Sequence, residues 1–377
     1  MSRQPKILFV AGDGASGRIT AETGELLKGE RPMQVHFIQR DGGAAGLYGG
    51  ENREHVVIDA SETHLAEPTV READLVVIAH SGTAFQLECA VASQAFAHRI
   101  PVLKVFDHLL GTRHAYLRDV VADWVERGRP PLRVTATTDA HVAELRALYP
   151  ELDDVVAKIG NPLHVQLETL LADGLPAARG RLREAHGLVT ASPVVSAFLS
   201  GNNEDQFAEM LDMADALAAV LATRGGGLAV NVHFVNQDWK PRVEERMAAW
   251  RDAGVPVSEG VKPDEMIALC DLLFASPTST TCERALANGI PVVQSCGSAE
   301  AAGLRVLSGM DFPYTPEMTY LAVLLATGKA GEWEFLLDSA LDPAQQALRR
   351  RFTDECGAVP ASGAIFRLRD LILEMTR

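Results

Sequence analysis

Short apolar runs alternate with amphipathic stretches of helical length along residues 1–160, and this alternation constrains the fold more than any other feature of the sequence. It is typical of βαβ units, in which helices join parallel strands. The apolar runs are continuous, which suits strands covered by helices on both faces. The expected strands are Lys6–Ala11, Met33–Ile38, His55–Ile58, Asp74–Ala79, Pro101–Val105, Leu132–Ala136 and Val155–Ile159. The expected helices are Thr83–His98, Thr112–Glu126 and a shorter one that ends before Pro150.

A second series of strands and helices follows Gly160-Asn161-Pro162 and a polar, helix-prone connector. Its first helix carries an apolar stripe from Phe207 to Leu221 and stops at the glycines of 225–227. The expected strands are Val194–Leu199, Leu228–Val235, Val255–Val257, Leu272–Ala275 and Pro291–Gln294. The expected helices between them are Pro241–Ala253, Asp264–Cys270 and Thr281–Ala287.

Three further helices are expected near the C-terminus, at Pro316–Ala326, Pro343–Glu355 and Ser362–Thr376. The sequence therefore predicts an α/β protein with two doubly wound, Rossmann-like domains and a helical tail. We expect an N-terminal domain at residues 1–165, a linker at 166–190, a second domain at 191–345 and the tail at 346–377.

The formal net charge of −15 argues against nucleic acid as a partner, because a protein that neutralises many phosphates normally has a basic surface. The five cysteines are widely spaced, without a C-x-x-C pair, and are expected to be reduced thiols. With no apparent signal peptide and no apolar run of membrane-spanning length, the chain is expected to be cytoplasmic. The basic run Arg349–Arg351 leaves membrane contact that is at most peripheral.

A glycine-rich segment, Gly12-Asp13-Gly14-Ala15-Ser16-Gly17, follows the first expected strand and opens a helix. It fits the G-x-G-x-x-G pattern, whose glycines let backbone amides approach an anion at a helix N-terminus. A nicotinamide dinucleotide also needs an acidic residue after the second strand, where this chain has Gln39-Arg40-Asp41. Three interpretations stay open: a dinucleotide site, a tight turn near another ligand, and a structural glycine turn.

A hydroxyl-rich loop follows the expected strand Leu272–Ala275 and leads into a helix. Hydroxyls and free amides converge there at the positive end of the helix dipole, which suits a diphosphate. Glu283, one turn into the helix, is placed to accept hydrogen bonds from sugar hydroxyls. The alternative is a Ser/Thr-rich helix cap with a surface glutamate.

Four motifs in order resemble those of GT-B glycosyltransferases such as lipid A disaccharide synthase and the peptidoglycan GlcNAc transferase. Asp271–Val293 is similar to their donor-binding strand, loop and helix, and Val261–Met266 to the segment beside the nucleotide base. Ala11–Gly17 resembles their N-terminal glycine-rich loop, and Ile159–Pro162 the G-N-P before the linker. The resemblance implies two domains that face a cleft, with C-terminal helices crossing back to the N-terminal domain.

The same resemblance implies a sugar transfer from a nucleoside diphosphate sugar, with a UDP-sugar favoured, to a small or lipid-linked acceptor. It implies no cofactor and no obligatory metal, and the sequence has no D-x-D motif. The donor-binding candidates are Gly12, Gly14, Ser200, Gly201, Asn202, Lys262, Ser276, Thr278, Ser279, Thr280 and Glu283.

An inverting transfer needs a base for the acceptor hydroxyl, and that base should lie in the N-terminal half at the carboxyl end of a strand. The candidates are Asp13, Asp107 and His108, with His80 the weakest.

Three other functions stay open. A non-hydrolysing nucleotide-sugar 2-epimerase shares the GT-B fold, but its H-x-E-A-G segment is missing from this sequence. The glycine-rich segment also allows an NAD(P)-dependent oxidoreductase. A nucleotide-binding protein without catalytic activity is the third.

Overall fold

A parallel sheet lies at the centre of each half of the chain in the computed structural model, which describes residues 4–28, 30, 34–40, 55–58, 62–80, 85–108, 115–233, 238–319, 321–344 and 363–377. The chain divides into two units. Unit 1 comprises residues 1–165 and 357–377, and unit 2 comprises residues 166–356.

The sheet of unit 1 is parallel throughout its described strands and has the order β3-β2-β1-β4-β5-β6-β7. Its strands are β1 (Lys6–Ala11), β2 (Gln34–Arg40), β3 (His55–Ile58), β4 (Leu75–Ala79), β5 (Val102–Val105), β6 (Leu132–Ala136) and β7 (Val156–Lys158). Its helices are α1 (Gly14–Lys28), α2 (Glu67–Arg71), α3 (Phe85–Ala97), α4 (Ala115–Glu126), α5 (Asp139–Leu148) and α16 (Ala364–Met375), with short 3₁₀ turns at Thr63–Ala66, Pro150–Val155 and Pro162–His164.

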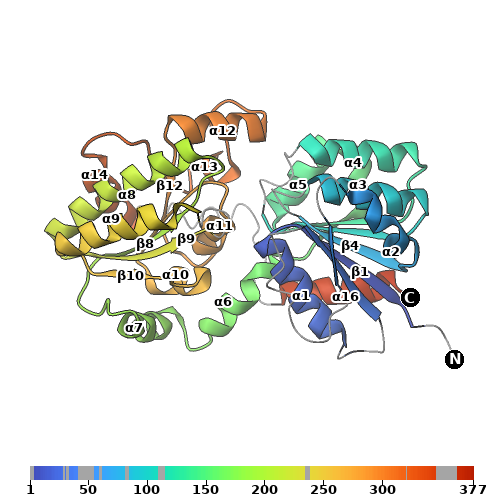
Figure 1. Ribbon diagram of the computed structural model, residues 1–377, viewed down its shortest axis with the longest axis horizontal. Coiled ribbons are helices and arrows are strands. Elements are labelled where there is room, and N and C mark those ends of the chain that lie inside the picture. Colours follow the sequence, from blue (N-terminus) through green and yellow to red (C-terminus); the bar gives the residue numbers. More distant parts are fainter. Residues whose placement is uncertain are drawn as a thin grey trace. The chain divides into compact units, whose positions relative to one another are not determined.

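Both faces of this sheet are buried, which explains the continuous apolar runs. On β1, Leu8 and Val10 join the core under α3 and α4, while Ile7 and Phe9 face the opposite core. The second core is covered by α1 and by α16, which lie side by side although they are far apart in the sequence (Figure 1). Arg367 on α16 also donates from Nε to the Ile159 carbonyl at 2.7 Å.

The sheet of unit 2 has the order β10-β9-β8-β11-β12-β13 and is also parallel throughout its described strands. Its strands are β8 (Val194–Leu199), β9 (Gly227–Val232), β10 (Val257–Glu259), β11 (Leu272–Ala275), β12 (Val292–Ser295) and β13 (Leu324–Ala326). Its helices are α6 (Val165–Leu170, which begins at the unit boundary), α7 (Leu175–Ala185), α8 (Glu204–Arg224), α9 (Lys240–Asp252), α10 (Pro263–Leu269), α11 (Thr280–Ala287), α12 (Ser298–Ser308), α13 (Pro316–Thr319) and α14 (Glu332–Leu341).

The two parallel sheets with helices on their faces confirm the predicted α/β fold class. One predicted element is wrong: Pro316–Ala326 is a short helix, α13, followed by the strand β13, which pairs with β12. The helix ends because Leu321 adopts a left-handed φ of 53°, and Ala322 donates back to the Glu317 carbonyl at 2.9 Å. A short apolar run has no periodicity that separates a strand from a helix. The predicted helix Pro343–Glu355 lies almost entirely outside the described residues, as does the run Arg349–Arg351.

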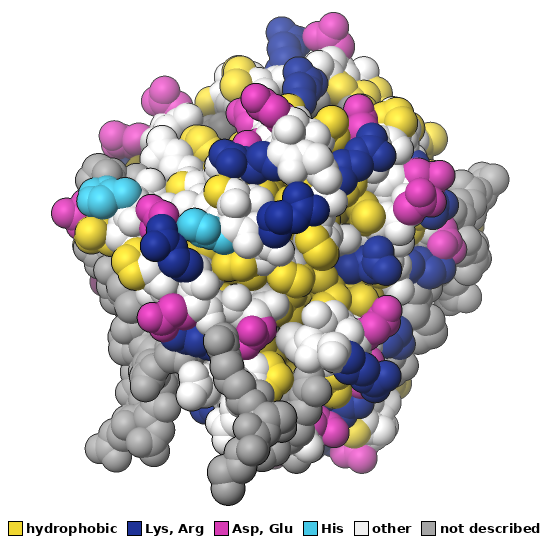
Figure 2. Space-filling model, turned by 90° about the vertical axis from the view of Figure 1, so that its right-hand side faces the viewer, with side chains coloured by type: hydrophobic (Ala, Val, Ile, Leu, Met, Phe, Trp, Pro, Cys, Tyr) yellow, Lys and Arg dark blue, Asp and Glu magenta, His cyan; other side chains and the backbone are white. Residues whose placement is uncertain are grey.

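Basic and acidic side chains are intermixed on the face of the molecule in Figure 2. Several cations of unit 1 lie against carboxylates: Lys6 Nζ is 2.6 Å from Glu72, and Arg127 Nε is 2.7 Å from Asp123. These two carboxylates partly neutralise the cations that they contact.

A buried ion pair joins two helices of unit 2. Arg284 on α11 is 2% exposed and pairs with Asp264 on α10. Because Asp264→Ala would strand a buried guanidinium, we expect it to lower the free energy of unfolding by about 3 kcal/mol or more. The control is Asp338→Ala, which breaks the exposed pair with Arg224 and should change stability little. Denaturant unfolding compares them, and equal losses would contradict a structural role for the buried pair.

Candidate functional site

The order of each sheet reverses beside its first strand, and ligands of open α/β sheets bind at the carboxyl ends of the strands there. In unit 1 this point lies between β1 and β4, and in unit 2 between β8 and β11. Asp13 follows β1, His80 follows β4 and His108 follows β5, whereas Ser200 follows β8 and Ser276 follows β11. Within each unit, the predicted residues therefore gather at or near the edge where a ligand is expected.

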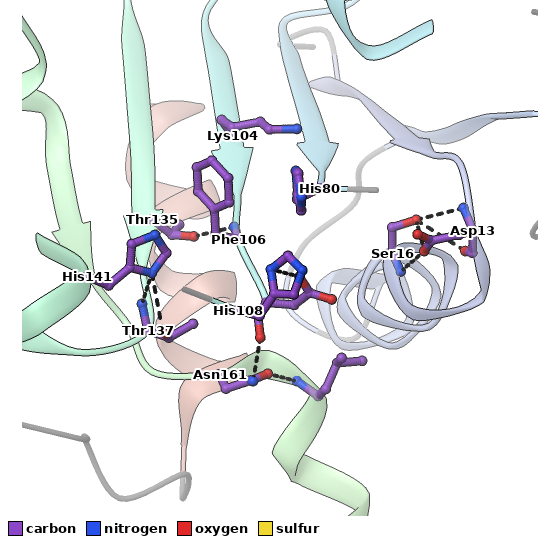
Figure 3. A network of polar contacts seen from close by, with 12 residues as sticks. Asp13, Ser16, His80, Lys104, Phe106, His108, Thr135, Thr137, His141 and Asn161 are labelled. Atoms are coloured by element: carbon purple, nitrogen blue, oxygen red, sulfur yellow. Dashed lines mark hydrogen bonds and ion pairs between the residues drawn. The ribbon is translucent and has the colours of Figure 1, made fainter. Parts of the chain in front are cut away.

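The glycine-rich turn after β1 is hydrogen-bonded within itself. Ser16 Oγ accepts the backbone amides of Gly12 at 3.1 Å and Asp13 at 3.0 Å. Asp13 Oδ1 in turn accepts the Ser16 amide at 2.9 Å, so this carboxylate caps α1 (Figure 3). These two amides are thus engaged within the loop, which favours the interpretation as a structural turn over a dinucleotide site.

The Asp107–His108 pair follows β5. Asp107 is 3% exposed, and its carbonyl accepts a hydrogen bond of 2.5 Å from Asn161 Nδ2. His108 Nδ1 lies 3.4 Å from Asp107 Oδ1, and the His108 side chain is 15% exposed. Burial raises the pKa of Asp107; His108 acts in the opposite direction, and Asp13 adds to the rise. The pair therefore has a buried carboxyl group behind a partly exposed imidazole.

A network of buried polar side chains adjoins this pair, and sequence analysis missed most of it. His80 Nδ1 is hydrogen-bonded to the Tyr116 hydroxyl, which donates to Glu88 Oε2 at 3.3 Å, and Glu88 forms a buried ion pair with Lys104. The rings of His80 and His108 are 5.2 Å apart (Figure 3). Burial, reinforced by Glu88, raises the pKa of Tyr116 well above its ordinary value. The sequence signal for this network is Lys104, because a charged residue within an apolar strand indicates a buried polar partner.

A further buried histidine, His141, holds the backbone at the end of β6. His141 is fully buried, and its Nδ1 accepts the Thr137 amide at 3.2 Å. Burial, with a smaller contribution from His108, lowers the pKa of His141 to about 3, so the ring is neutral at physiological pH. Thr135 Oγ1 accepts the Phe106 amide at 3.0 Å. The Thr135 contact holds the backbone directly before Asp107 and His108, and the His141 contact holds the backbone after β6 (Figure 3).

The hydroxyl-rich loop of unit 2 runs from the end of β11 into α11. Ser276 is buried, whereas Thr278, Ser279 and Thr280 are half-buried. Ser276 Oγ lies 2.9 Å from Thr278 Oγ1, and Ser279 caps α11 by accepting the Thr281 amide at 3.3 Å. The loop therefore presents partly exposed hydroxyls at the N-terminus of a helix.

Glu283 lies on α11 immediately after these residues and is 4% exposed. The structure thus places its side chain in the interior of unit 2. Its assignment to sugar hydroxyls stays a prediction.

Two carboxylates that the sequence did not suggest lie beside the loop. Ser276 Oγ donates to Glu300 Oε1 at 3.1 Å. Glu209, on α8, accepts the Ala299 amide at 3.0 Å and the Ser298 hydroxyl at 2.5 Å. Glu209 therefore occupies the N-terminus of α12, where an external anion would otherwise bind.

The predicted turn after β8 is also engaged internally. The Asn202 amide donates to Gln206 Oε1 at 2.8 Å, and the Ser200 amide to Met210 Sδ at 3.4 Å. Gly201 is required because a Cβ there would lie 2.7 Å from the Phe207 nitrogen.

Lys262 is exposed and begins α10. Its amide donates to Glu265 Oε2 at 3.3 Å, and the preceding Val261 carbonyl accepts Asn231 Nδ2 at 2.6 Å. Side chains of the same unit thus hold Val261 and Lys262, the first two residues of the segment expected beside the base.

No group of three or more His, Cys, Asp or Glu side chains among the described residues is arranged to hold a metal ion. None of the helices in the described ranges combines the length and the apolar character needed to cross a membrane.

No protein-family model and no curated protein matches the chain in sequence. Among solved structures, HepE of Anabaena in complex with UDP and glucose is 15% identical, with a TM-score of 0.56 over 98% of this chain and 99% of that one. The UDP-GlcNAc 2-epimerase of Neisseria meningitidis bound to UDP-GlcNAc is 14% identical, with a TM-score of 0.63 over 98% of this chain and 100% of that one. A glycosyltransferase of Rickettsia africae is 12% identical, with a TM-score of 0.54 over the whole of both chains. The chain therefore has a GT-B glycosyltransferase-like fold, as its motifs predicted.

The carboxyl group of Glu300 is expected to make stability depend on pH. Burial raises its pKa to about 7; the Ser276 hydrogen bond opposes this rise and Glu209 adds to it. The folded state then binds more protons than the unfolded state above pH 4.5, so the free energy of unfolding should fall as the pH rises to about 7.

Glu300→Gln should remove this fall, which is on the order of 3 kcal/mol. Denaturant unfolding at pH 5 and pH 8 measures it, with the exposed Glu334→Gln as the control. The same pH dependence in wild type and Glu300→Gln would show that Glu300 is not its source.

Proposed function

We propose that this chain is an enzyme that binds a nucleoside diphosphate sugar and transfers the sugar to an acceptor. The observation that carries the proposal is the loop from Ser276 to Thr280, which presents hydroxyls at the switch point of a doubly wound sheet and leads into α11. A diphosphate is the ligand whose charge such a site stabilises.

The donor's diphosphate is assigned to Thr278, Ser279 and Thr280, because these are the half-buried hydroxyls of the loop. As the bond between sugar and diphosphate breaks, negative charge grows on the departing oxygen. Hydroxyl donors and the dipole of α11 stabilise that charge more than they stabilise the intact donor. UDP is the favoured nucleotide, since HepE and the 2-epimerase of the same fold were crystallised with UDP or a UDP-sugar.

The base is assigned to His108. The acceptor hydroxyl passes its proton to His108 Nε2 as its oxygen attacks the sugar, and the nucleoside diphosphate leaves. Asp107, 3.4 Å from Nδ1, stabilises the imidazolium that forms. His108 is preferred to Asp13, which caps α1, and to His80, which is buried against Tyr116.

A 2-epimerase is the second candidate function, because the Neisseria epimerase has a TM-score of 0.63 with this chain, above the 0.56 of HepE and the 0.54 of the Rickettsia glycosyltransferase. Incubation with UDP-GlcNAc, followed by NMR, separates the two functions. An epimerase forms the C2 epimer without an acceptor, whereas a transferase leaves the sugar's configuration at C2 unchanged and releases UDP only when an acceptor or water takes the sugar. The absence of binding to UDP, GDP, TDP and CDP would contradict both.

The loop hydroxyls are tested by the double variant Thr278→Val and Thr280→Val. Each substitution removes a hydrogen bond to a charged phosphate, so the Kd for UDP should rise about tenfold or more. Thr223→Val, which removes an exposed hydroxyl at the end of α8, is the matched control and should bind UDP like wild type. Calorimetry measures all three proteins, and an unchanged Kd in the double variant would reject this diphosphate site.

The base is tested by UDP release from a UDP-sugar with water as the acceptor. His108→Gln and Asp107→Asn should each lower kcat about 10²-fold or more, with UDP affinity unchanged. Wild-type kcat should rise with pH through the raised pKa of Asp107, because the ionised carboxylate stabilises the imidazolium. Asp13→Asn, which preserves the cap of α1, should stay near wild type; a 10²-fold loss there and none at His108 would move the base to Asp13.

A further inference from the structure

A cavity in unit 2 lies at the opposite edge of its sheet from the hydroxyl-rich loop. It has a volume of about 420 Å³ and is lined by the residues that precede β8, β11 and β12, together with α7. These residues form the amino ends of the strands, so the cavity is distinct from the proposed donor site. α7, which packs against α10 (Figure 1), belongs to the segment that the sequence presented only as a polar connector.

The charges in this cavity do not balance. Arg179 and Arg183 lie one turn apart on α7 and share a single carboxylate, Asp271, at 3.3 Å and 2.8 Å. No other charged residue in the described part of the chain lines the cavity, so this lining carries a net charge of +1 (two arginines, one aspartate).

Asp271 has a third partner besides the two arginines, because its Oδ2 also accepts the Val194 amide at 2.9 Å. Arg183 is anchored, since its Nε donates to the Leu269 carbonyl at 2.8 Å. Arg179 has no such anchor: its Nε is buried and has no hydrogen-bond acceptor among the described residues. A buried donor of a charged group without an acceptor is costly, and the guanidinium that carries it belongs to a residue lining the cavity.

The neighbouring Arg181 shows the ordinary arrangement. It is exposed and pairs one-to-one with Asp173 at 3.1 Å. The excess positive charge on α7 is therefore confined to the two arginines that line the cavity.

We propose that this cavity binds a small molecule through a phosphate or carboxylate group held by Arg179 and Arg183. A guanidinium presents parallel N–H donors that match the two oxygens of such a group. The cavity is larger than a bare phosphate ion. The rest of the ligand contacts its apolar wall, which includes Leu175, Ile290 and Leu341.

Calorimetric titration of the full chain with inorganic phosphate, and separately with malonate, tests the proposal. Saturating UDP keeps the proposed donor site occupied. Constant ionic strength keeps the screening of charges equal in all titrations. Wild type should bind at least one of the two anions with one site per chain, and Arg179→Gln should weaken that binding about tenfold or more. Tighter binding of phosphate indicates a phosphate ligand, and tighter binding of malonate indicates a carboxylate ligand.

Arg181→Gln, on the same helix outside the cavity, is the matched control and should bind like wild type. Arg183→Gln is a second variant, and circular dichroism checks that each protein is folded. The proposal fails if neither anion binds, if Arg179→Gln and Arg183→Gln both bind like wild type, or if Arg181→Gln loses as much affinity as Arg179→Gln. Because UDP affinity is measured in the same proteins, failure of the donor site is distinguishable from failure of this one.

Discussion

Parallel pairing of strands that are buried on both faces is the constraint on which the rest of the structure depends. Since every described strand of a sheet runs in the same direction, the carboxyl ends of the strands lie at one edge of the sheet. The loops that follow the strands lie beyond this edge, where a ligand can bind. The chemistry-bearing residues after β1, β4 and β5 are brought together in this way, and so are those after β8 and β11. The amino ends meet at the other edge, where Arg179 and Arg183 of unit 2 lie against Asp271.

The burial and hydrogen bonding of acidic side chains shape the electrostatics of the two units. The chain carries a net charge of −15, yet some of its carboxylates are buried or half-buried. Glu209 occupies the N-terminus of α12, Glu300 is hydrogen-bonded to Ser276, and Asp107 lies beneath His108. The diphosphate site proposed at Thr278–Thr280 accordingly relies on hydroxyls and a helix dipole rather than on a basic field.

Most of the fold could be predicted from the sequence because most of its strands are continuous apolar runs bounded by glycine, proline and polar residues. β1, β3, β6, β8 and β11 begin and end at the predicted residues. β13 could not be predicted, because its three apolar residues are equally compatible with the end of a helix that begins at Pro316. The strand is defined by its pairing with β12. α12 and α14 were missed, although Trp333, Leu336, Leu337 and Ala340 give α14 an apolar stripe at helical spacing.

The predicted site residues lie at the expected strand ends, because sheet topology alone determines that placement. Their hydrogen bonds were not predicted. Those of Ser16 to the amides of Gly12 and Asp13 are local, within one turn. The hydrogen bond from Ser276 to Glu300, 24 residues away in sequence, depends on tertiary packing that no local pattern encodes.

A crystal structure of the protein with UDP bound tests the central claim most directly. The account predicts that the diphosphate oxygens lie within hydrogen-bonding distance of Thr278, Ser279 or Thr280 at the start of α11. A diphosphate bound instead at the Gly12–Gly14 turn, or a nucleotide elsewhere on the chain, would contradict it.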